Sequence, residues 1–161
     1  MMRLEYINPF VEAAVSMLEA VLSVSITRGE IYLKAKSQPV LGVSAIVGLA
    51  GDVEGRVLID MSIETAISIA SIMNDEQFGE LNDLAKATIT ELANMIVAQA
   101  VTKLSDLGFR FDLTPPTIFT GEKMEISDFE VEALIVPIET ELGKLEINVA
   151  LREKNGHEEE S

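Results

Sequence analysis

Two segments of the chain carry apolar residues at the spacing of an amphipathic helix, residues 8–22 and residues 82–107. Asn8 followed by Pro9 is typical of a helix start, and Gly108 is typical of a helix end. At about 100° per residue, one face of the second helix gathers an apolar stripe that must face a sheet. Its members are Ala85, Ile89, Leu92, Ile96, Ala100, Leu104 and Leu107.

Other stretches alternate or run apolar in the manner of β-strands. They are residues 23–35, 39–51, 54–61, 109–113, 124–140 and 143–151. The segment AGDVEG at 50–55 predicts a tight turn, so the strands on either side of it form a hairpin. Ser62 is placed to cap a short helix over 62–73, and Pro137 favours a sheet edge or a bulge.

The order of these elements repeats. Each half supplies a helix, an irregular extended stretch, a long strand, a tight turn and a final strand, and Glu12 aligns with Glu91 while Val15 aligns with Asn94. We therefore predict an α/β (α+β) sandwich of pseudo-twofold duplicated helix–strand units, with an antiparallel or mixed sheet and the long helices packed on one face. One domain over 1–154 would consist of halves 1–75 and 76–154, followed by an acidic disordered tail at 155–161. Two unrelated helix-plus-hairpin units are the alternative.

Charge and composition exclude several functions. The formal charge is −15, from 27 acidic and 12 basic residues, and no basic cluster offers a surface for nucleic acid or anionic membranes. The N-terminal segment carries Glu5 and Glu12 where a signal peptide would be basic and then apolar, so we expect a cytoplasmic protein. The chain has no cysteine, and its single histidine, His157, lies in the polar tail. Histidine or thiol catalysis and a metal site on such ligands are therefore not expected.

Glu91 and Asn94 fall on the helix face opposite the apolar stripe, three residues apart, so their side chains are neighbours. Ala87, Met95 and Ala98 surround them, where an ordinary solvated face would be dense in Lys and Glu. Small apolar residues allow another backbone to approach closely, which predicts a docking surface with a carboxylate and an amide at its centre. On spacing alone, two plain solvated residues remain the alternative.

The segment ITELANMIVAQAVTKLSDL, with Glu-x-x-Asn inside it and Pro115 and Pro116 about twenty residues later, resembles the CheC/CheX/FliY family of bacterial chemotaxis phosphatases. The duplicated layout over residues 1–155 is most similar to the CheX branch. Ala87 stands where the family motif has Asp or Ser, and the prolines come a residue or two early.

This resemblance implies that the chain dephosphorylates the aspartyl phosphate of a phosphorylated CheY-type response regulator. Asn94 would hold the attacking water and Glu91 would anchor the regulator. The chain would need no cofactor of its own, because the regulator binds the Mg²⁺. Val15 in place of the second amide implies one working site per chain. The resemblance also implies a homodimer, because CheX proteins are generally homodimers.

Two other classes of function stay open. A non-catalytic dimeric adaptor or flagellar-switch module could use the same fold, although such a protein has no need of both Glu91 and Asn94 on one accessible face. A small-ligand domain with a pocket between the halves is the third possibility, but GDVEG and GEK lack the spacing of a phosphate-binding loop.

Overall fold

The computed structural model describes residues 4–34, 37–39, 41–121, 125–127 and 133–153. Its helices are α1 (Leu4–Leu22), α2 (Ile63–Asn74) and α3 (Asp83–Asp106). The strands of the first half are β1 (Thr27–Arg28), β2 (Tyr32–Lys34), β3 (Ser37–Pro39), β4 (Val43–Gly51) and β5 (Val53–Met61). The second half has β6 (Phe111–Leu113), β7 (Thr117–Thr120), β8 (Glu125–Ser127), β9 (Ala133–Thr140) and β10 (Gly143–Glu153). None of the described helices is long and apolar enough to cross a bilayer.

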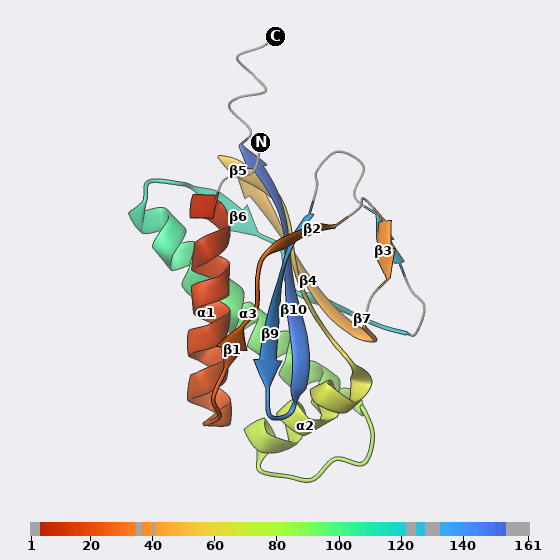
Figure 1. The fold of residues 1–161 in the computed structure, drawn as a ribbon. Helices are drawn as coiled ribbons and strands as arrows, with labels where there is room; N and C mark the ends of the chain where they lie inside the picture. The colour runs from red at the N-terminus through yellow and green to blue at the C-terminus, as the bar shows by residue number, and fades with distance from the viewer. Residues whose placement is uncertain (1–3, 35–36, 40, 122–124, 128–132, 154–161) are drawn as a thin grey trace.

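Eight strands form one sheet whose backbone path is β1-β9-β10-β5-β4-β6, with β2 also pairing with β9 and β7 with β4. The long helices α1 and α3 lie side by side on one face of this sheet, as Figure 1 shows. Alternate residues of the four long strands point into that helix layer, including Val47, Ile59, Val136 and Ile147. This sandwich of helices on an antiparallel sheet confirms the predicted fold class.

The duplication predicted from the sequence is visible in the positions of the elements. Helix α1 begins at Leu4 and α3 at Asp83, 79 residues later, whereas β4 and β9 begin at Val43 and Ala133, 90 residues apart. The strands β5 and β10 are also 90 residues apart and pair antiparallel at the centre of the sheet. In their register Leu58 lies opposite Asn148. These two residues are also 90 positions apart, so each is the equivalent of the other in the duplicated halves. The pseudo-twofold axis therefore passes through this pair.

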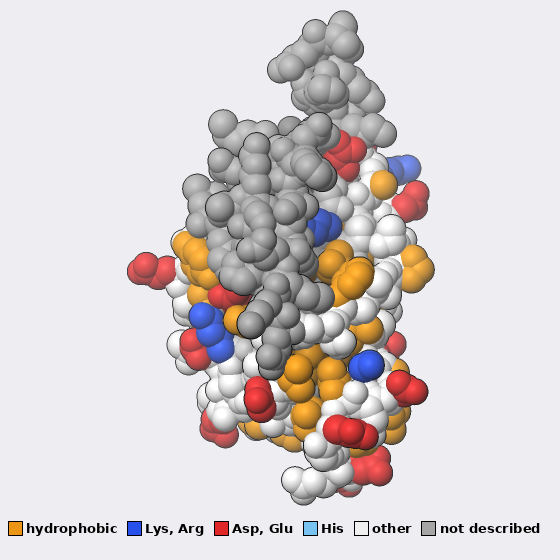
Figure 2. All heavy atoms as spheres, turned by 90° about the vertical axis from the view of Figure 1, so that its right-hand side faces the viewer, with side chains coloured by type: hydrophobic (Ala, Val, Ile, Leu, Met, Phe, Trp, Pro, Cys, Tyr) orange, Lys and Arg blue, Asp and Glu red, His pale blue; other side chains and the backbone are white. Residues whose placement is uncertain are grey.

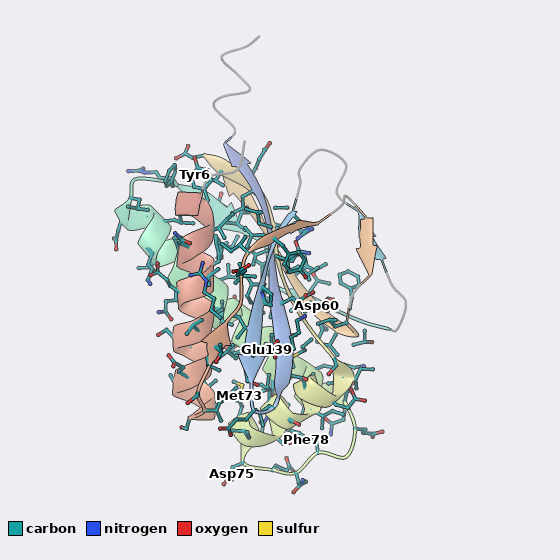
Figure 3. The ribbon with its side chains drawn as sticks, in the orientation of Figure 1. Tyr6, Asp60, Met73, Asp75, Phe78 and Glu139 are labelled. Atoms are coloured by element: carbon teal, nitrogen blue, oxygen red, sulfur yellow. The ribbon has the colours of Figure 1, made fainter. Side chains whose placement is uncertain are left out.

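The two long helices run in opposite directions, as such an axis requires (Figure 1). Tyr6, near the start of α1 (Figure 3), packs its ring edge-on against Phe109, just beyond the end of α3. The ring centroids are 5.1 Å apart and the planes lie at 84°, a favourable geometry for an aromatic pair. The two helices are thus held together at this end by more than aliphatic contacts.

The predicted start of the first helix was wrong. Helix α1 begins at Leu4, so that Pro9 lies inside it and Asn8 does not cap it. Tyr6 and Ile7 are fully buried in the core, and this burial holds the chain before Pro9 in the helix against the local signal. Within the described part of the strand-like stretch at 23–35, residues 23–34, the chain forms two short strands, β1 and β2, with Gly29 between them.

Pro137 lies in β9, which is not an outer strand, because β10 pairs with one side of it and β1 and β2 with the other. Pro137 lies opposite the break between β1 and β2. At this break its carbonyl oxygen accepts a 2.8 Å hydrogen bond from the Gly29 amide. A missing N–H is tolerated at such a break. Pro137 is therefore not at the sheet edge, as one of the two expectations had it, but at a position where the neighbouring strand is interrupted.

Candidate functional site

Helix α3 carries the predicted site and is fixed at both ends. Its N-cap Asn82 accepts a 2.8 Å hydrogen bond from the Ala85 amide. Six of the seven residues of the predicted apolar stripe are buried against the sheet, which confirms the orientation of the helix. Leu107 is the exception at 59% exposure, because it is the C-cap and the chain turns there. The outward face of α3 is therefore defined by the buried residues beneath it.

On this outward face Glu91, Asn94, Ala87 and Ala98 are exposed, and Met95 is half-buried. Within the part of the chain that the structure describes, the side chains of Glu91 and Asn94 make no hydrogen bond or ion pair. A carboxylate and an amide thus stand side by side with all their hydrogen-bonding capacity available to a partner. We call these five residues the docking face.

The short helix α2 braces α3 close to this face. Ser62 caps α2 by accepting a 3.1 Å bond from the Thr65 amide, as the sequence predicted. At the other end of α2, Asn74 Nδ2 donates to Thr88 Oγ1 at 2.8 Å. Thr88 is buried and immediately follows Ala87 in α3. The turn of α3 that leads into Glu91 is thereby held in place by a side chain from α2.

Glu12, the counterpart of Glu91 in the first half, has an ion-pair partner. Glu12 Oε2 lies 2.9 Å from Lys103 Nζ, so the exposed glutamate of α1 is paired with a lysine near the end of α3. Val15, at the position corresponding to Asn94, is half-buried and offers no polar group. The two halves therefore share a helix face but not its chemistry.

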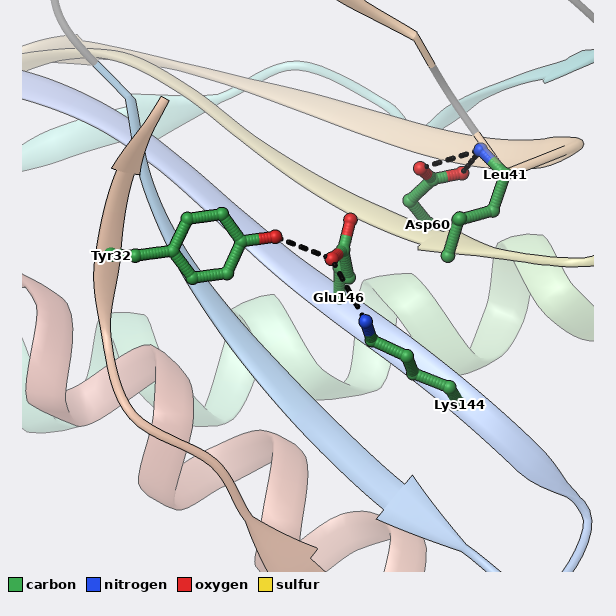
Figure 4. Close-up of polar contacts among 5 residues, drawn as sticks. All are labelled: Tyr32, Leu41, Asp60, Lys144 and Glu146. Carbon is green, nitrogen blue, oxygen red and sulfur yellow. Dashed lines mark hydrogen bonds and ion pairs between the residues drawn. The ribbon is translucent and has the colours of Figure 1, made fainter. Parts of the chain in front are cut away.

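The sheet face away from α1 and α3 contains buried acidic residues that the sequence analysis did not single out. Asp60 accepts bonds from the Leu41 amide, at 3.1 and 2.9 Å, and from Ser44 Oγ at 2.9 Å. Glu146 accepts a 2.6 Å bond from Tyr32 and lies 3.5 Å from Lys144 Nζ (Figure 4). A carboxylate inside an otherwise apolar strand segment, as in LIDM and LEIN, was the available signal.

These two carboxylates attach peripheral parts of the chain, Tyr32 and the Leu41 backbone, to the central strands of the sheet. No group of three or more potential ligands gathers anywhere among the described residues. Burial, followed by the hydrogen bond and the negative charge of Glu146, raises the pKa of the Tyr32 phenol well above its usual value. On this side of the molecule hydrophobic side chains gather with acidic ones around them (Figure 2).

A cavity of about 530 Å³ lies along α2 and the loop after it, where Asp75 and Phe78 are labelled in Figure 3. Its lining combines Ile67, Ser71, Ile72 and Phe78 with Leu142 from the β9–β10 turn. No residue of α3 lines it, so it is separate from the docking face. Most of its lining comes from α2 and the loop that follows this helix.

Comparison with known proteins identifies a family that matches this chain. The family description "Chemotaxis phosphatase CheX" matches residues 43–139. The CheY-P phosphatase CheX of Thermotoga maritima is 36% identical over 87 residues, which span 53% of this chain and 56% of that protein. The match thus covers little more than half of that relative.

Solved structures extend the similarity over nearly the whole chain. The CheX of a CheX–CheY–BeF3–Mg²⁺ complex from Borrelia burgdorferi is 45% identical with a TM-score of 0.82, covering 94% of this chain and all of that one. A CheC-like protein from Shewanella sp. PV-4 is 23% identical with a TM-score of 0.85, covering 94% and 99% of the two chains, and so shares the fold. The family match over more than half of the residues and this shared architecture together show that the chain belongs to the CheX family of chemotaxis phosphatases.

Proposed function

We propose that this chain dephosphorylates the aspartyl phosphate of a CheY-type response regulator, with Glu91 and Asn94 as the working groups. The observation that carries the proposal is the docking face itself, a carboxylate and an amide with no partner in the described chain, exposed among small apolar residues. The 45% identical CheX of Borrelia burgdorferi is seen in complex with CheY, BeF3 and Mg²⁺, which supports a regulator as the partner.

Asn94 is proposed to position the attacking water. An acyl phosphate is already reactive, so hydrolysis depends on in-line placement of water and stabilisation of charge, not on a nucleophile from the phosphatase. An amide donates and accepts hydrogen bonds at once, and can therefore orient a water by its proton and by its lone pair. The exposed position of Asn94 allows it to enter the regulator's site.

Glu91 is proposed to anchor the regulator through a cation beside the phosphoryl group. Its carboxylate is one helical turn from Asn94, so an ion pair at Glu91 fixes where the amide enters the partner's site. Ala87, Met95 and Ala98 provide the flat surface that lets the two backbones approach. The Mg²⁺ is proposed to be bound by the regulator, and the chain to act as a cytoplasmic homodimer.

The adaptor alternative predicts a different result in a direct test. The rate of phosphate release from a phosphorylated CheY-type regulator is measured with the wild type, with Asn94→Ala and with Ser105→Ala as a matched control on the exposed side of α3. We expect Asn94→Ala to lower the rate by about 100-fold, the usual effect of losing one preorganised polar group. Its stability should not fall, because alanine is the better helix former. Undiminished turnover by Asn94→Ala, or no turnover by the wild type, would favour the adaptor.

A further inference from the structure

Helices α2 and α3 meet mainly through apolar side chains. Ala70 of α2 and Phe78 of the loop after it are buried together with Ala85 of α3, and Ile67 and Leu81 pack around them. Apolar contacts are non-directional, so they fix the rotation and shift of one helix against the other less sharply than a hydrogen bond does. The polar contacts of α3 therefore decide how accurately its outward face is placed.

Asn74, the last residue of α2, makes the one side-chain hydrogen bond that joins α2 to α3 among the described residues. Its Nδ2 donates to the Ala70 carbonyl and to Thr88 Oγ1, both at 2.8 Å. Thr88 Oγ1 uses its own proton on the Leu84 carbonyl at 2.9 Å, so only a donor can satisfy its other side. Thr88 is buried and Asn74 half-buried, which limits competition from water. The carboxamide of Asn74 thus matches both of its acceptors.

Two polar contacts hold α3 on either side of the docking face. Toward the start of the helix, Thr88 lies three residues before Glu91 and about 60° from it around the helix axis. Toward the end, Lys103 lies 2.9 Å from Glu12, but these side chains are 39% and 57% exposed, and an exposed ion pair contributes little. The buried hydroxyl of Thr88 therefore provides the stronger attachment, and it is the one next to Glu91.

We propose that Asn74 is a positioning residue for the phosphatase reaction, acting through Thr88 on the docking face. This proposal rests on the function proposed above. Hydrolysis needs a water held in line with the phosphorus, and a small misplacement of the group that holds it lowers the rate steeply. A shift of Thr88 moves the turn of backbone that carries Glu91 and, one turn further on, Asn94. Binding tolerates such a shift better than the reaction does, because the same side chains remain exposed to the regulator.

The test compares turnover with binding in variants of this contact. Asn74→Ala and Thr88→Val should each lower kcat for a phosphorylated CheY-type regulator by about tenfold, as expected when a reacting geometry is displaced. The Kd for the regulator loaded with beryllofluoride and Mg²⁺ should stay close to that of wild type. The double variant should be no slower than either single one, because both substitutions remove the same hydrogen bond. Thr88→Ser keeps the hydroxyl and should retain the wild-type kcat.

Ser71→Ala is the matched control, because Ser71 lies on the same helix as Asn74 and is bonded to α2 and its following loop instead of to α3. Its hydroxyl donates to the Ile67 carbonyl at 2.7 Å and accepts from the Phe78 amide at 3.1 Å. Urea unfolding should find both S71A and N74A destabilised, whereas S71A should keep the wild-type kcat.

Three results would overturn the positioning role of Asn74: an equal loss of kcat in S71A and N74A, a Thr88→Ser variant as slow as Thr88→Val, or single losses that multiply in the double variant. Asn94→Ala is measured alongside. If Asn94→Ala is as fast as wild type, the proposed function has failed and this proposal with it. A slow Asn94→Ala together with an unchanged Asn74→Ala overturns the positioning role alone.

Discussion

The phenol of Tyr32 donates a 2.6 Å hydrogen bond to Oε2 of Glu146, a carboxylate that is only 5% exposed. Tyr32 belongs to the short peripheral strand β2, and Glu146 to β10 at the centre of the sheet (Figure 4). Strand β9 lies between them and pairs with both. One side chain therefore reaches over the sheet and ties its edge to its middle.

Tyr32→Phe should destabilise the protein by about 1.5–3 kcal/mol, the range for a hydrogen bond to a charged group. The phenylalanine ring keeps the packing of the tyrosine ring, so the change in the free energy of unfolding reports the contribution of the hydroxyl group. Lys144→Met is the matched control, because Lys144 is half-exposed at 3.5 Å from the same carboxylate and should cost less than about 1 kcal/mol. Urea unfolding of the two variants measures both, and a larger loss for Lys144→Met would contradict this ranking.

The same pair predicts a pH dependence. The pKa of Tyr32 is raised in the folded protein, so the proton is held more tightly there than in the unfolded chain. The resulting stability is fully present below the ordinary tyrosine pKa of about 10 and is lost as the pH rises from there through the folded pKa. The free energy of unfolding of the wild type should exceed that of Tyr32→Phe up to about pH 10, and the difference should disappear at higher pH. Urea unfolding at a series of pH values measures it. In E146Q, ultraviolet titration should find the Tyr32 pKa closer to its ordinary value.

Local patterns predicted the parts of the fold that local chemistry decides. The cap Ser62 follows from local capping chemistry, and the inward stripe of α3 and the outward position of Glu91 and Asn94 follow from helix geometry. The start of α1 could not be predicted, because Tyr6 is kept in the helix by contacts with residues such as Phe109, about a hundred positions away. The Lys103–Glu12 pair depends on the antiparallel arrangement of two helices from different halves. The roles of Glu91 and Asn94 remain predictions from the family resemblance.

Gly55 is a position where the central pair of strands admits no side chain. Its φ is +141°, and a Cβ there would fall directly onto the carbonyl oxygen of Ala150 in β10. Gly55→Ala should cost about 3 kcal/mol or more, from the positive φ and from overpacking against backbone that cannot move aside. Gly79→Ala is the control, because its Cβ meets nothing within 4 Å. Thermal unfolding should show a large drop in Tm for the first variant and almost none for the second; similar values would contradict the packing argument.

Removal of the charge of Glu91 should change both the affinity for the regulator and its dependence on salt. If Glu91 pairs with a cation of the regulator, Glu91→Gln should weaken binding by roughly tenfold at low ionic strength, which corresponds to about 1.4 kcal/mol. The wild-type affinity should fall more steeply with added salt than that of the variant, because only the wild type has the ion pair to be screened. Asp106→Asn is matched in charge, since Asp106 is an exposed carboxylate in the last turn of α3, away from the docking face. Titration calorimetry with a beryllofluoride-loaded regulator at several salt concentrations provides the measurement. Parallel salt dependences for wild type and Glu91→Gln would remove Glu91 from the anchoring role and leave Asn94 as the one polar contact of the docking face.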